Sequence, residues 1–94
     1  MNEQEILRKL EFLAIAVIEK TLGRVPTEKE LDAGILKSRN IDHKGKFEMF
    51  ISYQNTVVAK FEAQQDHLGN FMGQFQYLGD KDEFLEEMMA NWRN

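Results

Sequence analysis

Residues 10–22 read Leu-Glu-Phe-Leu-Ala-Ile-Ala-Val-Ile-Glu-Lys-Thr-Leu, and the seven residues from Phe12 to Ile18 include no polar side chain. A surface helix normally carries one apolar stripe, so a helix that is apolar on nearly every side must be covered by other elements or by a second copy of itself. We therefore expect the rest of the chain to cover this helix.

The first helix is expected to extend from about Asn2 to Gly23. Upstream and within the apolar stretch, large apolar residues recur at helical spacing: Ile6, Leu10, Leu13 and Val17. Glycine adopts the left-handed conformation that commonly ends a helix, so Gly23 is the predicted cap. Pro26 then prevents continuation.

A short second helix is predicted after Pro26. Thr27 and Glu30 have the spacing of a capping box, in which each side chain accepts a hydrogen bond from the other residue's backbone N–H. Gly34 would weaken the interior of this helix by about 1 kcal/mol relative to alanine. Its predicted apolar row consists of Leu31, Ile35 and Leu36.

Residues 23–31, Gly-Arg-Val-Pro-Thr-Glu-Lys-Glu-Leu, resemble the helix-turn-helix junction in the middle domain of bacterial sigma factors. Capping rules account for the whole segment. Because nothing downstream resembles a sigma factor, we transfer no function from this likeness.

The pattern changes after the second helix. Residues 38–46, Ser-Arg-Asn-Ile-Asp-His-Lys-Gly-Lys, have no regular period and are expected to form a polar loop. From there the apolar residues alternate with a period of two, which predicts strands over residues 47–53, 57–64 and 71–77.

The register of these strands follows from keeping apolar groups on one face. We expect Tyr53 to lie opposite Val57, with residues 54–56 as the turn. In the second hairpin, Phe61 is expected opposite Gly73, so that bulky and small side chains face each other. The predicted result is an antiparallel meander with one apolar face.

A last helix follows Gly79. Asp80 and Glu83 have the spacing of a second capping box. The apolar residues of this helix fall at helical spacing: Phe84, Leu85, Met88, Met89 and Trp92. The expected fold class is α+β: a single domain of residues 1–94 with an N-terminal helix pair, a three-stranded antiparallel meander and a C-terminal helix, packed in two layers.

Composition restricts the possible chemistry. The chain has no cysteine, which excludes disulfides, thiolate metal ligands and thiol nucleophiles. The apolar run at residues 12–18 is far shorter than the roughly 20 residues that span a bilayer, and it lacks a basic leader. We therefore expect a cytoplasmic protein without a membrane partner.

No catalytic signature is present in the sequence. There is no glycine-rich phosphate loop, and no Ser-His-Asp arrangement is suggested by the spacing. No carboxylate sits within an apolar pattern where burial would raise its pKa. We expect neither an enzyme nor a bound cofactor.

Two Asp-His dipeptides are the candidates for a metal site: Asp42-His43 and Asp66-His67. The predicted register brings the loop before the first strand near the loop after the second strand. Two imidazoles and two carboxylates would suit zinc or a similar divalent ion. Since these residue types are also ordinary in loops, metal binding is the third interpretation of function.

Four basic residues are the candidates for a nucleic-acid site in residues 37–46: Lys37, Arg39, Lys44 and Lys46. The order of strands followed by a helix is similar in topology to double-stranded RNA-binding domains, which present a basic helix N-terminus to phosphates. Here that turn reads Asp80-Lys81-Asp82-Glu83 and would repel phosphates. A nucleic-acid-binding regulator is therefore the alternative interpretation.

The last predicted helix is the candidate partner-binding element. Its proposed contact residues are Asp82, Glu83, Glu86, Glu87, Met88, Met89 and Trp92. Methionine and tryptophan are enriched where proteins meet. With the apolar first helix, this predicts a protein partner or a homodimer through either helix. The leading interpretation is a small module that binds or inhibits another macromolecule, such as an accessory or inhibitor protein of a phage or mobile element.

Overall fold

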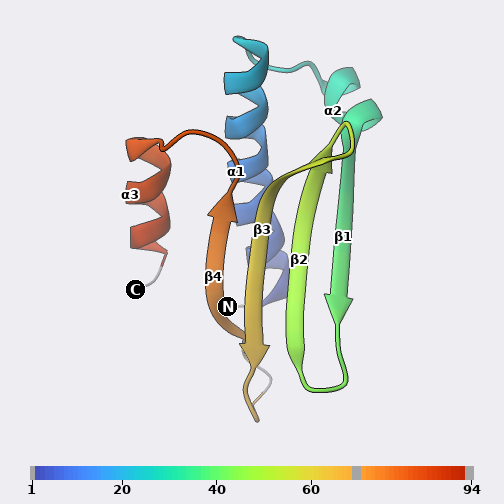
Figure 1. Cartoon of the computed structure of the whole chain (residues 1–94), viewed down its shortest axis with the longest axis vertical. Helices are drawn as coiled ribbons and strands as arrows, with labels where there is room; N and C mark the ends of the chain where they lie inside the picture. Colours follow the sequence, from blue (N-terminus) through green and yellow to red (C-terminus); the bar gives the residue numbers. More distant parts are fainter. Residues whose placement is uncertain (1, 69–70, 93–94) are drawn as a thin grey trace.

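The computed structural model describes residues 2–68 and 71–92. Its elements, in chain order, are α1 (Glu3–Leu22), α2 (Glu28–Gly34), β1 (Ile35–Ile41), β2 (Lys46–Tyr53), β3 (Thr56–Gln65), β4 (Phe71–Tyr77) and α3 (Glu83–Asn91). The strands form one antiparallel sheet in the order β1-β2-β3-β4 (Figure 1). The fold is α+β as predicted, but the sheet has four strands instead of three.

Helix α1 lies behind the sheet in Figure 1 and contacts β2, β3 and β4. The Asn2 side chain accepts a hydrogen bond from the Glu5 backbone N–H, and Gly23 ends the helix in the left-handed region at φ 72°. The predicted cap is thus confirmed. One side of the helix supplies much of the core: Ile6, Leu10, Leu13, Ala14, Val17 and Ile18.

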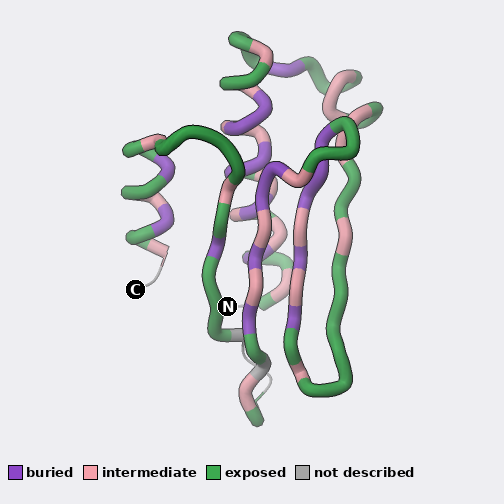
Figure 2. The backbone as a smooth tube through the Cα atoms, in the orientation of Figure 1, coloured by how far each residue is buried: buried purple, intermediate pink, exposed green. Residues whose placement is uncertain are grey.

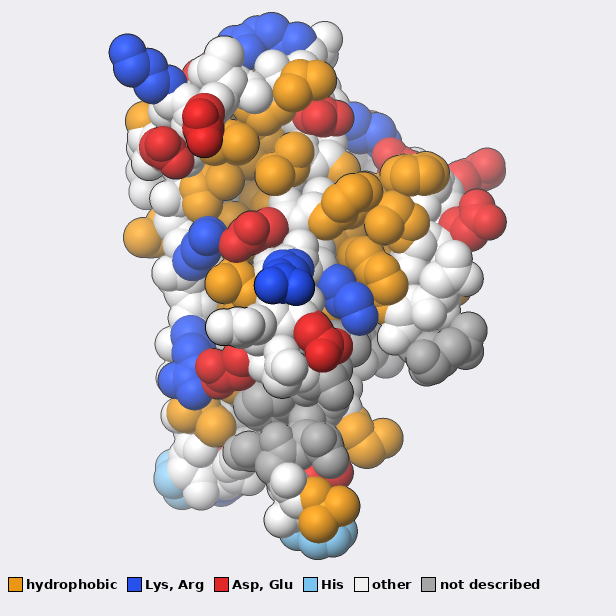
Figure 3. All heavy atoms as spheres, turned by 180° about the vertical axis from the view of Figure 1, so that it is seen from behind, with side chains coloured by type: hydrophobic (Ala, Val, Ile, Leu, Met, Phe, Trp, Pro, Cys, Tyr) orange, Lys and Arg blue, Asp and Glu red, His pale blue; other side chains and the backbone are white. Residues whose placement is uncertain are grey.

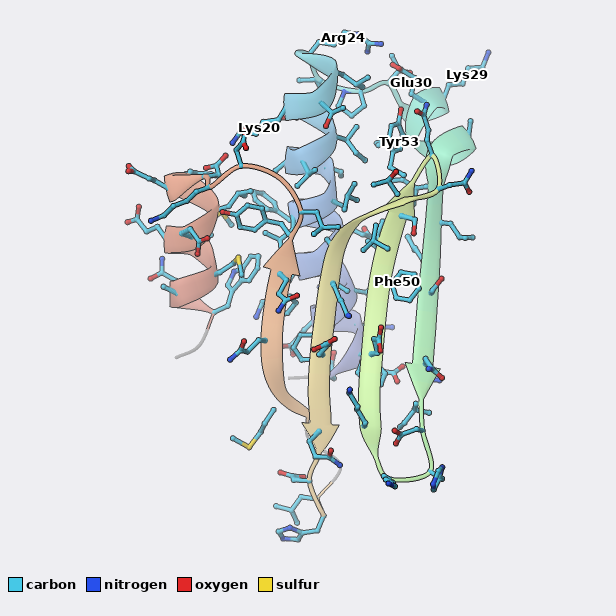
Figure 4. All side chains as sticks on the ribbon, in the orientation of Figure 1. Lys20, Arg24, Lys29, Glu30, Phe50 and Tyr53 are labelled. Carbon is cyan, nitrogen blue, oxygen red and sulfur yellow. The ribbon has the colours of Figure 1, made fainter. Side chains whose placement is uncertain are left out.

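Helix α2 begins with the predicted Thr27–Glu30 capping box. It ends at Gly34, however, and Ile35 starts β1, so the predicted helical row that included Ile35 and Leu36 is wrong. The reason lies in the packing, because a Cβ on Gly34 would come within 2.5 Å of the Tyr53 ring. Figure 4 shows Tyr53 below α2. The chain therefore turns at Gly34, where the absence of a side chain leaves room for this ring.

Strand β1 replaces the first four residues, Ser38 to Ile41, of the loop predicted over residues 38–46. It pairs with β2 from Ile35 opposite Tyr53 to Ile41 opposite Phe47. As an edge strand it is mostly exposed, as Figure 2 shows. An exposed edge strand does not need an alternating apolar pattern, which is why residues 35–41 carry no strand signal in the sequence.

The β2–β3 register is as predicted in its main part, with Ile51 opposite Ala59. Between Ile51 and Ser52 the register shifts by a β-bulge, so that Tyr53 pairs with Thr56 instead of Val57. The turn is Gln54-Asn55, with φ values of 50° and 66°. Two consecutive left-handed residues are typical of the tight hairpin turn that matches strand twist, and the bulge compensates for the shorter loop.

The predicted β3–β4 register is wrong by two residues. Phe61 lies opposite Phe75, with ring centroids 4.6 Å apart, and Gly73 lies opposite Ala63. A shift of two residues keeps every side chain on its face, so the apolar pattern cannot distinguish the two registers. Direct aromatic packing and the close approach at Gly73 favour the observed one.

Helix α3 begins two residues later than the predicted capping box implied. Asp82, not Asp80, is the N-cap, and its side chain accepts a hydrogen bond from the Leu85 backbone N–H at 3.2 Å. Leu85 and Met89 are buried in the core. None of the helices in the described part of the chain is long and apolar enough to cross a membrane.

Candidate functional site

The side of the molecule that carries α1 exposes several large apolar groups. Phe12 is 43% exposed, Val25 71% and Phe84 63%, while Ile15 and Ala16 are half-buried. We call these five residues the α1 outer surface. Figure 3 looks onto this side and shows apolar side chains gathered in two neighbouring areas of its upper half. Contiguous exposed apolar groups of this kind mark interaction sites on soluble proteins.

The spacing of residues along α1 explains this surface. Arg8, Phe12, Ile15 and Glu19 follow one another at intervals of four, three and four residues, so they lie along one side of the helix. That side is opposite the one buried against the sheet. The sequence contained this signal, but a helix that is apolar all round does not reveal which side the sheet leaves uncovered.

Two grooves border α1 on this side. The first, between α1 and α2 with β1, is lined by Glu11, Ile15, Leu31, Asp32, Ile35, Leu36 and Lys37. The second, between α1 and α3, is lined by Phe12, Ala16, Glu19, Lys20, Gly23, Arg24, Val25, Asp82, Phe84 and Leu85. The α1 outer surface therefore has a groove on each side of the helix. Such grooves can accept side chains of another protein.

An ion pair joins the α1–α2 loop, which carries Val25, to helix α2. The Arg24 guanidinium binds both carboxylate oxygens of Glu30 at 2.7 Å, and Figure 4 shows the two at the same end of the molecule. This hydrogen bonding, with that of the Thr27 backbone N–H, lowers the pKa of Glu30 to about 2. The interaction ties the α1–α2 loop around Val25 to the capping box of α2.

A second ion pair joins α1 to α3. The Lys20 ammonium lies 3.1 Å from the Asp82 carboxylate. The Lys20 hydrogen bond, followed by that of the Leu85 backbone N–H, lowers the pKa of Asp82. Asp82 therefore caps α3 and also ties its first turn to α1, beside the groove between the two helices.

Most of the predicted partner residues on α3 have internal roles. Met89 is in the core, and the Trp92 ring packs against Phe75 with centroids 5.2 Å apart. The Lys9 ammonium lies over the Trp92 ring, and Glu86 accepts a hydrogen bond from the Tyr77 hydroxyl at 2.9 Å. Met88 is half-buried, and Glu83 and Glu87 are exposed. The large apolar residue that α3, Glu83–Asn91, exposes is Phe84.

The predicted basic site is divided by the structure. Lys37 and Arg39 lie on β1 and form ion pairs with Glu11 and Glu3 of α1 at 2.9 and 2.6 Å. Lys44 is exposed in the β1–β2 turn, and Lys46 is exposed at the start of β2. Half of the predicted phosphate contacts are thus neutralised by neighbouring carboxylates.

The Asp-His pairs lie in turns that their aspartates stabilise. Asp42 accepts hydrogen bonds from the Lys44 and Lys46 backbone N–H groups, both at 2.9 Å. Asp66 accepts one from the Leu68 N–H at 2.8 Å. Within residues 2–68 and 71–92, no group of three or more histidine, cysteine or acidic side chains could hold a metal ion. A site that includes His43 and His67 stays a prediction without geometric support.

A scan against protein-family models and searches of curated proteins and of solved structures found no match. The α1 outer surface is therefore interpreted from its own geometry. It offers apolar contact area and charged margins, which suit the binding of another folded surface.

Proposed function

We propose that this chain is a small protein-interaction module that binds another macromolecule through the α1 outer surface. The observation that supports this most is the exposure of two phenylalanines, Phe12 and Phe84, at one groove between α1 and α3. Exposing large aromatic groups side by side in water is unfavourable, and aromatic groups are enriched at the cores of protein interfaces. A partner that covers them gains the free energy of their burial.

The margin of the surface suggests how a partner is oriented. Glu83 and Glu87 are exposed on α3, the helix that also carries Phe84. Acidic groups at the rim of an interface steer association more than they add affinity. We propose a cytoplasmic accessory or inhibitor protein, of the kind that phages and mobile elements carry, as the biological context.

A tagged pull-down from nuclease-treated lysate tests this proposal. The bait is compared with the Phe12→Glu variant and with Met72→Glu, since Met72 is 73% exposed on β4. We expect a stoichiometric protein, either endogenous or an untagged copy of the chain, to bind the wild type and Met72→Glu but not Phe12→Glu. Equal capture by all three baits, with folding verified by circular dichroism, would show that the α1 outer surface is not the binding site.

The nucleic-acid alternative is separated by the same samples. Material that is retained only when nuclease is omitted, and that is lost on Lys44→Glu and Lys46→Glu substitution, would favour the basic residues at the β1–β2 turn. Phosphate-dominated binding would also weaken steeply with salt. Binding through the α1 outer surface should be far less sensitive to salt, because burial of apolar area drives it.

A further inference from the structure

We infer that the occupant of the α1 outer surface is a second copy of this chain, whose α1 packs antiparallel to the first. The inference rests on the proposed function and names its partner. It follows from two charged residues, Arg8 and Glu19, that lie at opposite ends of the exposed stripe of α1. Between them the stripe carries Phe12 and Ile15.

Arg8 and Glu19 differ from their charged neighbours. On the same side of the molecule, cations of α1 and β1 are paired with carboxylates, as in Lys20–Asp82 and Lys37–Glu11. Within the described residues, neither the Arg8 nor the Glu19 side chain has an ion pair or a side-chain hydrogen bond. Glu19 is half-buried nonetheless. A half-buried carboxylate at the edge of an apolar groove is more stable when a cation faces it.

An antiparallel second helix supplies that cation. If Arg8 lies opposite Glu19 of the second copy, the two-fold axis also places Glu19 opposite Arg8 of the second copy. The two contacts are eleven residues apart along α1, which is about 16 Å at 1.5 Å per residue. Each surface then meets an identical one and the contact closes on itself, as in most homodimers.

The apolar residues fit the same register. With the charged ends aligned, Phe12 lies opposite Ile15 of the second copy, near the middle of the contact. Ile15 lines the groove that Leu31 and Ile35 also line, so the phenyl ring has an apolar site to enter. Helices pack at 8–10 Å when side chains of one enter the grooves of the other. Phe12 and Ile15 would supply affinity, and the charged pairs would set orientation.

The free edge of β1 is a weaker interface. The Gly34 carbonyl accepts from the Gln54 N–H, and the Asp42 N–H donates to the Lys46 carbonyl, so backbone groups of even-numbered residues point to β2. The odd-numbered residues therefore present their backbone groups to solvent. Among them are Lys37 and Arg39, whose charged side chains are of the kind that blocks edge-to-edge strand pairing.

Charge reversal tests the inferred dimer. Arg8→Glu and Glu19→Arg each place two like-charged pairs in the contact, and each should weaken self-association by roughly tenfold or more. An equimolar mixture of the two variants restores opposite charges at both contacts. We expect this mixture to form heterodimers by native mass spectrometry and sedimentation velocity, and the Arg8→Glu/Glu19→Arg double variant to form homodimers again. Lys44→Glu, at the distant β1–β2 turn, is the matched control and should dimerise normally.

The outcomes separate this inference from the proposed function. A wild type that stays monomeric at several hundred micromolar, while it captures another protein in a Phe12-dependent manner, would overturn the dimer and keep the interaction module. A wild-type dimer that the charge reversals leave intact would contradict the antiparallel α1 contact. A monomer that captures nothing through Phe12 would remove both.

Discussion

Replacing Gly34 with alanine tests the packing that ends α2 and begins β1. In an exposed helix, alanine is more favourable than glycine by up to about 1 kcal/mol. In this structure the added Cβ would lie 2.5 Å from Cε2 and 2.9 Å from Cδ2 of Tyr53, a side chain that is only 8% exposed. Helix propensity therefore predicts that Gly34→Ala raises the free energy of unfolding, whereas the packing predicts that it lowers it.

The packing should dominate. Inserting a methyl group into an occupied core site costs about 1–3 kcal/mol, because the neighbours must leave their preferred positions. The Gln54 N–H donates to the Gly34 carbonyl at 3.0 Å, which keeps the backbone close to the ring. We expect Gly34→Ala to lower the free energy of unfolding by up to about 2 kcal/mol once the gain in helix propensity is subtracted.

Urea unfolding of a double-mutant cycle measures this effect. Tyr53→Val removes the ring, and in that background Gly34→Ala should stabilise the protein by up to about 1 kcal/mol. The reversal of sign identifies the ring as the cause. Stabilisation by Gly34→Ala in the wild-type background would refute the placement of Tyr53 against α2.

Two further predictions concern other contacts. Hydrogen bonds from Arg24 lower the pKa of Glu30 to about 2, so their stabilising effect is present above the unfolded pKa near 4.5 and is lost as pH falls towards 2. Arg24→Gln should therefore raise the Glu30 pKa towards 4.5 in an NMR titration. An unchanged pKa would exclude the Arg24–Glu30 pair. A Cβ on Gly73 would lie 2.5 Å from that of Ala63, so Gly73→Ala should lower the free energy of unfolding by about 1–3 kcal/mol. The control Gln74→Ala, on the exposed surface of β4, should change it by less than about 0.5 kcal/mol. Equal effects of the two substitutions would contradict the β3–β4 register.

Local signals in the sequence predicted the elements that depend on local interactions. Gly23 ends α1, and Thr27 with Glu30 starts α2, because capping uses residues within one turn of each other. The pairing of Ile51 with Ala59 also followed, since it keeps the apolar groups on one face.

The errors arose where tertiary contacts decide the structure. The β3–β4 register depends on Phe61 meeting Phe75, a contact that the period-two pattern cannot specify. The end of α2 depends on the Tyr53 ring, which is distant in sequence from Gly34. The N-cap of α3 was predicted at Asp80 from local spacing alone, whereas the ion pair with Lys20, a residue distant in sequence, favours Asp82.

The candidate site was predicted in part. The apolar character of α1 indicated a helix with more apolar surface than one sheet face covers, and Phe12 is exposed accordingly. On α3 the sequence could not separate core from surface, because Met89 and Trp92 have the same residue types whether they pack inward or bind a partner. Packing against Phe75 decides the position of Trp92, and Phe84 becomes the exposed group.

Covering of the α1 outer surface can be measured directly, because the chain has no cysteine and a single introduced thiol is unique. Ala16→Cys places one in the groove between α1 and α3, and Met72→Cys places a control on exposed β4. The measurement is the maleimide labelling rate of each thiol against protein concentration, without and with any captured partner. We predict that labelling at residue 16 slows several-fold as the surface is covered, while labelling at residue 72 does not change. A labelling rate at residue 16 that, like the rate at residue 72, does not change with protein concentration or with a captured partner would contradict the proposed interface.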